Sequence, residues 1–312
     1  MYRRFAAACA AMIVLSGAAA AAYPERPIEF IVPFPAGGTV DLVARKLGEA
    51  LSDVLGQSVV VITRDGGSGV IGVQAVANAS PDGYTVAFTP NGPLTVQPSL
   101  RKTPFSLASF HPLCQVFTYP YVLAVAENSP VRSLGDLIAR AKDGNVNYAF
   151  GGVGTAPQFA ALQLAQAAGV KMLGVPYRGD PPGAMALKGG EVQSAILTVE
   201  VARQQKFRIL AVFAEQRIPV LPNVPTAREQ GYDVIASTMA GLVAPAKIRD
   251  DAAKVLEAAC EKAVHSPKFT AGMKQLEQTV AWLPSDKFSA VLSSDTESKR
   301  KLIESSGIRT EQ

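Results

Sequence analysis

The chain has 312 residues, a formal net charge of +4, two histidines and three cysteines. Residues 1–22 contain two arginines and no acidic residue, so the formal charge of the remainder is +2. This weak charge argues against a nucleic-acid binder, which needs a concentrated basic surface. The scarcity of histidine argues against a histidine-based metal site or catalytic triad. A single core rarely supports a chain of this length, so we expect two lobes.

The first 22 residues have the layout of a secretory signal peptide. Two arginines precede an apolar run over residues 5–15, and a series of alanines ends at Ala22. The run is too short to span a membrane, and the small residues predict cleavage before Tyr23. We therefore expect a periplasmic protein. Cys9 leaves with the signal, and Cys114 and Cys260 remain, either as a disulfide or as two buried free thiols.

After Tyr23 the pattern alternates between strands and helices. Hydrophobic periodicity predicts strands at 28–34, 58–63 and 84–89 and helices at 40–55 and 70–79. Such an alternation is typical of an α/β domain with a largely parallel sheet.

The loop from Pro33 to Asp41 joins the first strand to the first helix through Gly37 and Gly38. The first N–H groups of a helix have no partner within it, so an anion could accept hydrogen bonds from them. The alternative is that the two glycines only allow the chain to turn.

A second alternating unit follows an extended segment at 116–126. Ser133 is expected to cap its first helix. The unit is then predicted to contain helices at 134–142, 157–168 and 182–189 and strands at 146–150, 171–176, 192–197 and 207–213. A second extended segment lies at 234–244, before helices near 247–264 and 267–276, a strand at 279–283 and a last helix from Ser285. If both extended segments are crossovers, one lobe comprises 23–120 and 237–312, and residues 121–236 form an inserted second lobe.

Three motifs with enzymatic associations are weak here. Gly67-Ser68-Gly69-Val70-Ile71-Gly72 fits a dinucleotide fingerprint, but Asp82 precedes the next strand instead of ending it. Gly66 to Val70 fails the nucleophile-elbow pattern at its last position. Ser298-Lys299-Arg300-Lys301 is better explained as a solvated helix face. A hydrolase or cofactor enzyme remains an alternative, but the chain lacks paired groups for acid-base catalysis.

The loops after the predicted strands share one chemistry, since they combine small residues, hydroxyls and amides. They include Thr89-Pro90-Asn91-Gly92, Gly151-Gly152-Val153-Gly154-Thr155 and Tyr177-Arg178-Gly179. Such loops offer many hydrogen-bond donors and few nucleophiles, which suits holding a small anion. Ordinary turn chemistry is the alternative for each loop taken alone.

With these motifs the chain resembles the Bug family, the extracytoplasmic solute receptors of tripartite tricarboxylate transporters. The resemblance covers essentially the whole mature chain. It is carried by Tyr23-Pro24-x-Arg26-Pro27-Ile28, Val32-Pro33-Phe34-Pro35-Ala36-Gly37-Gly38-x-x-Asp41, Ser80-Pro81-Asp82-Gly83-Tyr84-Thr85, Val175-Pro176-Tyr177-Arg178-Gly179, Leu221-Pro222-Asn223-Val224-Pro225-Thr226 and Ala244-Pro245.

The resemblance implies a type II periplasmic binding protein fold, in which two α/β lobes joined by two crossover strands close on a ligand. It implies that backbone N–H groups, hydroxyls and water hold a ligand carboxylate, without an arginine clamp, a metal or a cofactor. The ligand-binding residues expected on this basis are Phe34, Pro35, Ala36, Gly37, Gly38, Asp41, Thr89, Asn91, Gly152, Thr155, Gln158, Tyr177, Arg178, Gly179 and Leu197.

The chain departs from the family pattern in the second lobe. Gln158 and Leu162 stand where the family commonly has a histidine and a glutamate, and Gln193 and Leu197 replace two acids. Loss of the acid at 197 removes a partner for a ligand amino group. A simple or aromatic carboxylate is therefore expected before an amino acid.

The expected function is that of a monomeric periplasmic receptor, not an enzyme. It would capture a small organic carboxylate and deliver it to the membrane permease subunits of a tripartite tricarboxylate transporter. The alternative is a binding component that reports its ligand to a membrane histidine kinase, and the sequence does not separate the two.

Overall fold

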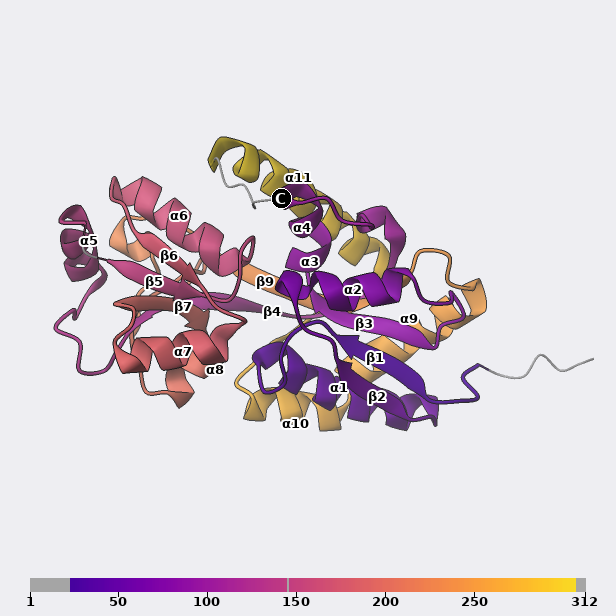
Figure 1. Cartoon of the computed structure of the whole chain (residues 1–312). Coiled ribbons are helices and arrows are strands. Elements are labelled where there is room, and N and C mark those ends of the chain that lie inside the picture. Colours follow the sequence, from indigo (N-terminus) through magenta and orange to yellow (C-terminus); the bar gives the residue numbers. More distant parts are fainter. Residues whose placement is uncertain (1–22, 145, 307–312) are drawn as a thin grey trace, which may run out of the picture.

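The computed structural model describes residues 23–144 and 146–306. The predicted signal peptide, residues 1–22, lies outside the described residues. Figure 1 shows two lobes side by side, with strands β4 (Phe110–Val125) and β9 (Ser237–Pro245) running between them. Within the described residues, no helix is long and apolar enough to cross a membrane.

The first lobe is a sheet covered by helices. Its strands are β1 (Ile28–Val32), β2 (Val59–Thr63), β3 (Thr85–Pro90), β10 (Val280–Pro284) and parts of β4 and β9. Its helices are α1 (Thr39–Leu55), α2 (Val70–Ala77), α3 (Gly92–Thr95), α4 (Gln97–Leu100), α9 (Asp250–Val264), α10 (Pro267–Gln275) and α11 (Ser285–Ser306). Strand β1 pairs in parallel with β2 and β3, and β3 pairs antiparallel with β9. The chain leaves this lobe along β4 and returns to it through β9.

The second lobe is built from the middle of the chain. Its strands are β5 (Asn147–Phe150), β6 (Leu173–Pro176), β7 (Ser194–Thr198) and β8 (Arg208–Val212), and its helices are α5 (Leu134–Lys142), α6 (Ala156–Ala168), α7 (Asp180–Gly189) and α8 (Val199–Gln204). Strand β5 pairs in parallel with β6 and β7, and β7 and β8 pair antiparallel with the far end of β4. The assignment of residues 23–120 and 237–312 to one lobe and 121–236 to the other stays a prediction in its boundaries.

Strand β4 is longer than the predicted extended segment because it starts at Phe110. Two prolines lie inside it, and a proline has no N–H to donate to a neighbouring strand. The β4–β9 register shifts between Pro112 and Cys114, so the pairing is irregular beside the first proline. Pro120 lies opposite Ser237, at the first residue of β9. The prolines therefore explain why the sequence pattern did not predict residues 110–115 as part of this strand.

Local signals set several helix ends as predicted. The Ser133 hydroxyl accepts a hydrogen bond from the Asp136 amide at 3.1 Å, and the Asp136 carboxylate accepts one from the Ser133 amide at 3.0 Å. This reciprocal cap satisfies two amides that the helix leaves free. Helix α1 ends at Gly56, which has a left-handed φ of 66°.

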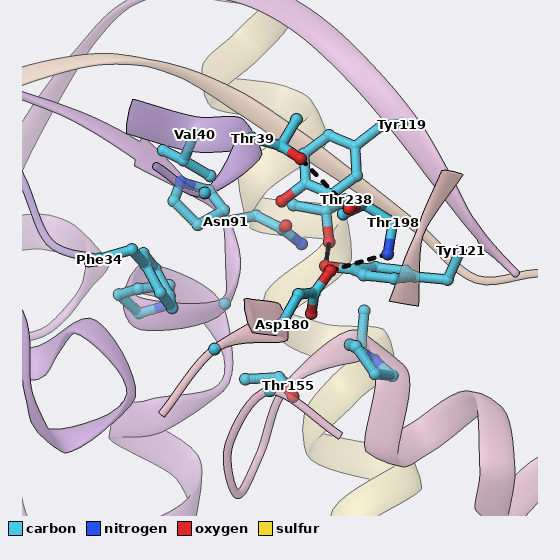
Figure 2. A pocket seen from close by; sticks show the side chains of 18 of the residues that line it. Phe34, Thr39, Val40, Asn91, Tyr119, Tyr121, Thr155, Asp180, Thr198 and Thr238 are labelled. Atoms are coloured by element: carbon cyan, nitrogen blue, oxygen red, sulfur yellow. Dashed lines mark hydrogen bonds between the residues drawn. The ribbon is translucent and has the colours of Figure 1, made fainter. Parts of the chain in front are cut away.

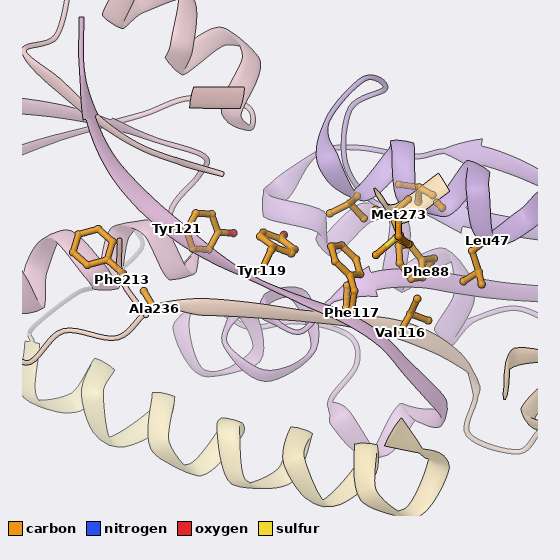
Figure 3. Close-up of a cluster of buried hydrophobic side chains, with 14 of the residues drawn as sticks. Leu47, Phe88, Val116, Phe117, Tyr119, Tyr121, Phe213, Ala236 and Met273 are labelled. Atoms are coloured by element: carbon orange, nitrogen blue, oxygen red, sulfur yellow. The ribbon is translucent and has the colours of Figure 1, made fainter. Parts of the chain in front are cut away.

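One apolar cluster extends along β4 from the first lobe toward the second (Figure 3). Phe117, Tyr119 and Tyr121 alternate along the strand and therefore share one of its faces. Their successive ring centroids lie 5.1 and 5.5 Å apart. Phe88 stacks on the Phe117 ring, and Phe213 belongs to the same cluster in the second lobe. The crossover is thus packed on its side chains as well as paired through its backbone.

Cys114 on β4 and Cys260 on α9 form a disulfide, which decides between the two alternatives left open by the sequence. Both residues are buried. The bond closes a loop of 146 residues and ties the crossover strand to the helix packed behind it.

Removing this disulfide should lower stability. Closing so long a loop restricts the unfolded chain, an effect worth about 5 kcal/mol in the chain-entropy description. We expect Cys114→Ala/Cys260→Ala to unfold at a lower urea midpoint than the wild type under oxidising conditions. Reductant present throughout the titration should lower the wild-type midpoint and leave the variant unchanged. Equal midpoints for both oxidised proteins would contradict this expectation.

Candidate functional site

A cavity of about 790 Å³, including space at its open mouth, lies between the two lobes. Residues from both lobes and from both crossover strands surround it (Figure 2). Its lining consists of Phe34, Pro35, Gly38, Thr39, Val40, Pro90, Asn91, Gly92, Pro93, Val96, Tyr119, Tyr121, Gly151, Thr155, Ala156, Pro157, Gly179, Asp180, Pro181, Thr198, Thr238 and Lys299. Most of these side chains are apolar, aromatic or small, so the few polar groups decide what can bind.

The crossover strands contribute neutral hydroxyl groups. Tyr119 and Tyr121 come from β4 and Thr238 from β9, and all three side chains are buried. The Thr238 hydroxyl donates a hydrogen bond to the Tyr121 hydroxyl at 2.9 Å. Burial raises the pKa of both tyrosines above the usual value, so the phenols stay protonated at neutral pH. They can orient a ligand by hydrogen bonding without adding charge.

Three helices begin at this cavity. The residues that precede α1, α6 and α7 are Gly38, Thr155 and Gly179, and all three line it. The N-terminus of a helix carries partial positive charge and free N–H groups. Their convergence favours an anion in the cleft.

Helix α1 offers more free amides than the other two. Its first helical hydrogen bond runs from the Leu42 amide to the Gly38 carbonyl, so the amides of Thr39, Val40 and Asp41 have no acceptor within the helix. Helices α6 and α7 carry Pro157, Pro181 and Pro182 in their first turns, and proline has no N–H. The largest set of free amides therefore lies on the first lobe, at the end of the loop from Pro33 to Asp41.

Asp41 supports this loop from behind. Its Oδ2 accepts a hydrogen bond from the Gly37 amide at 3.0 Å, and its two oxygens receive a bidentate contact from Arg45 at 2.9 and 3.0 Å. Gly37 has a φ of +82°, a conformation that favours glycine. The carboxylate is buried outside the cavity lining, so the structure places Asp41 as a support of the loop.

Two further carboxylates, neither of them among the predicted site residues, lie on the second-lobe side. Asp180, half-buried, accepts a hydrogen bond from the Thr198 amide at 2.7 Å. Glu200 is buried and accepts hydrogen bonds from the Thr39 hydroxyl at 3.1 Å and the Gln204 amide group at 3.0 Å. Burial raises the pKa of both carboxyls, and the hydrogen bonds oppose that rise.

The lobes are in contact around the cavity, as in a closed receptor. The Thr39 hydroxyl lies 3.2 Å from the Thr198 hydroxyl as well as within reach of Glu200. Gln97 donates a hydrogen bond across the cleft to the Val153 carbonyl at 2.9 Å. On a further side Arg203 of the second lobe forms an ion pair with Glu277 of the first.

Helix α11 also reaches the second lobe. In Figure 1 it runs across the first lobe toward α6. Lys299 lies over the Phe159 ring of α6, with Nζ 5.5 Å from the ring centroid. Phe159 and Ile303 belong to one small apolar cluster, and Lys299 lines the cavity. The last helix therefore closes one side of the cleft.

The structure brings some of the predicted site residues to the cavity and leaves others outside its lining. Phe34, Pro35, Gly38, Asn91, Thr155 and Gly179 line the cavity, whereas Ala36, Gly37, Asp41, Thr89, Gly152, Gln158, Tyr177, Arg178 and Leu197 do not. Leu197 is buried in the second-lobe core, and Gln158 accepts a hydrogen bond from the Gly154 amide at 2.7 Å. The Asn91 amide group donates to Asp295 on α11 at 2.6 Å. Ligand contacts by the predicted residues stay predictions.

Comparison with known proteins shows which family the chain resembles. Residues 43–308 match the family described as the tripartite tricarboxylate transporter family receptor. A UPF0065 protein of Pseudomonas sp. strain P51 is 35% identical over 293 residues, which is 90% of this chain and 87% of the relative.

Two solved structures give the fold independently. The periplasmic binding protein BugD superposes with a TM-score of 0.86 at 30% identity, covering 93% of this chain and 100% of that one. A protein of R. palustris with adipate superposes with a TM-score of 0.86 at 26% identity, covering 92% and 99%. The expected two-lobe periplasmic binding protein fold is confirmed.

Thr39→Val should loosen the closed arrangement. Valine keeps the branched shape of the side chain but removes the hydroxyl that donates a hydrogen bond to Glu200 across the cleft. Hydrogen bonds to charged groups contribute about 1.5–3 kcal/mol to stability. We expect small-angle X-ray scattering of the ligand-free variant to give a larger radius of gyration than the wild type. Thr39→Ser keeps the hydroxyl and should behave as the wild type. An unchanged radius in Thr39→Val would remove this hydrogen bond from the account of closure.

Proposed function

Since this chain belongs to the tripartite tricarboxylate transporter receptor family, we propose that it captures a small organic carboxylate and delivers it to the permease subunits of such a transporter. The Bug resemblance is thereby confirmed, and the proteins it resembles are binding proteins, not enzymes. We propose further that residues 1–22 export the chain to the periplasm and are cleaved, and that the receptor acts as a monomer.

One observation carries the carboxylate proposal. The amides of Thr39, Val40 and Asp41 have no acceptor within α1, and Thr39 and Val40 line the cavity between the two lobes. Amides at a helix N-terminus match a carboxylate in both charge and hydrogen bonding. The protein walls around the cavity strengthen that attraction, because a dielectric lower than that of bulk water screens charge less.

The lining supports a small ligand with an apolar body. Phe34, Val40, Pro93 and Val96 present hydrocarbon to the cavity, and Lys299 is its only basic lining residue among those described. An arginine clamp is therefore replaced by backbone donors and neutral hydroxyls. Adipate in the similar R. palustris protein is a small carboxylate of this general kind.

Isothermal titration calorimetry of the mature protein against mono-, di- and tricarboxylates, including aromatic acids, tests the proposal. At least one small carboxylate should bind at one site per chain. Native mass spectrometry of protein purified from its own periplasm should show the mass of a co-purified acid. Folded, ligand-free protein that binds no carboxylate would contradict the proposed function.

Gly38→Val should weaken carboxylate binding at least tenfold, about 1.4 kcal/mol. A Cβ at this position would meet only the Pro35 carbonyl, at an ordinary 3.6 Å, so the fold accepts it. The branches of valine would instead occupy the space beside the α1 amides. Calorimetry with the tightest-binding carboxylate of the panel measures the loss.

The matched control for this variant is Gly135→Val, which adds the same side chain to the first turn of α5, away from the cavity. It should bind as the wild type. Wild-type affinity in Gly38→Val would exclude the α1 loop from the binding site.

A further inference from the structure

We propose that Asp180 makes this receptor select carboxylates that carry a hydrogen-bond donor, a hydroxyl or an ammonium group, and reject dicarboxylates. The inference rests on the proposed function, because it names the ligand class of the same cleft. It assigns the specificity of the second-lobe wall to a residue outside the motifs that identify the family.

Asp180 retains acceptor capacity in the cavity. It is the first residue of α7, and the Thr198 amide donates to its Oδ2 at 2.7 Å. A carboxylate has about four acceptor positions. Among the described residues, no lysine, arginine or histidine forms an ion pair with it. A ligand donor that reached this wall would complete the hydrogen bonding of the carboxylate.

The surroundings of Asp180 keep its charge uncompensated. The groups that face it from neighbouring elements are the neutral phenols of Tyr119 and Tyr121 and the carboxyl of Glu200, as well as Thr198. Burial raises the pKa of the Asp180 carboxyl, and the hydrogen bonds from Thr198 and the start of α7 oppose that rise. A second ligand carboxylate placed here would meet the Asp180 carboxylate as a like charge, whereas a hydroxyl or ammonium group would meet an acceptor.

The α1 side and the Asp180 side of the cavity therefore suit different functional groups of a ligand. Figure 2 shows Val40 and Asp180 on different sides of the group of lining residues, with Phe34 to the left of both. The α1 amides near Val40 suit the ligand carboxylate, and Asp180 suits a donor. The apolar residues elsewhere in the lining, among them Phe34 and Pro93, suit a hydrocarbon or aromatic body.

Matched ligand series test the inference by calorimetry. One series is hexanoate, 6-hydroxyhexanoate, 6-aminohexanoate and adipate, and the other is benzoate, 4-hydroxybenzoate, 4-(aminomethyl)benzoate and terephthalate. Within each series only the terminal group changes. In at least one series the hydroxyl or ammonium member should bind at least tenfold tighter than the diacid, and the better of the two identifies the donor.

Asp180→Asn should reduce that preference at least tenfold, because asparagine still accepts from the Thr198 amide but carries no charge. Asp180→Ser also removes the charge. If the asparagine variant does not fold, the serine variant should likewise show a smaller preference for the donor-bearing acid over the diacid. Asp143→Asn removes the same charge from an exposed position on the same lobe and should leave the preference unchanged. Thermal unfolding reports whether each variant is folded.

The outcomes separate this inference from the proposed function. Diacids that bind the wild type as tightly as the donor-bearing acids would overturn the inference alone. A preference that persists in Asp180→Asn or Asp180→Ser would also overturn it, since the carboxylate would then not be its source. Failure of every carboxylate to bind folded protein would overturn both.

Discussion

The pairing of β4 with β9 is the constraint on which the rest of the structure depends. Both strands continue between the lobes, and their antiparallel register places Tyr119 opposite Thr238. The same strand β4 also pairs with β7, β8 and β10. The hydroxyl groups of the cleft are therefore positioned by a continuous backbone ladder, and the loops of both lobes are held relative to that ladder.

Charge in the cleft is arranged by the backbone more than by basic side chains. The α1 amides supply positive potential on one wall, and Asp41 stabilises their loop from outside the cavity. On the other wall Asp180 and Glu200 add negative charge close to hydroxyl donors. The cleft is thus polar at both ends with opposite sign, so the orientation of a bound molecule is set together with its position.

The sequence predicted the alternating elements, the two extended crossovers and the α1 loop, because each depends on periodicity or on residues adjacent in the chain. It did not predict the role of Asp180, whose partner Thr198 lies 18 residues away and meets it only through the pairing of the second sheet. The hydrogen bond between Thr39 and Glu200 was likewise not predictable from the sequence, since 161 residues separate them. Tyr119 and Tyr121 alternate across Pro120 in a predicted extended segment, so the sequence indicated that they share one face of a strand. It did not indicate that this face points toward the cavity.

The prolines at the start of α6 and α7 leave few free amides on the second-lobe wall of the cleft. This difference between the walls bears on the kinetics of binding as well as on its chemistry. An anion that diffuses into an open cleft finds most of its amide donors already in place on the first lobe, while the facing lobe offers few amides and the negative charge of Asp180. For the proposed ligand, we therefore expect the first lobe to set the association rate and the second lobe, by closing over the bound molecule, to set the residence time.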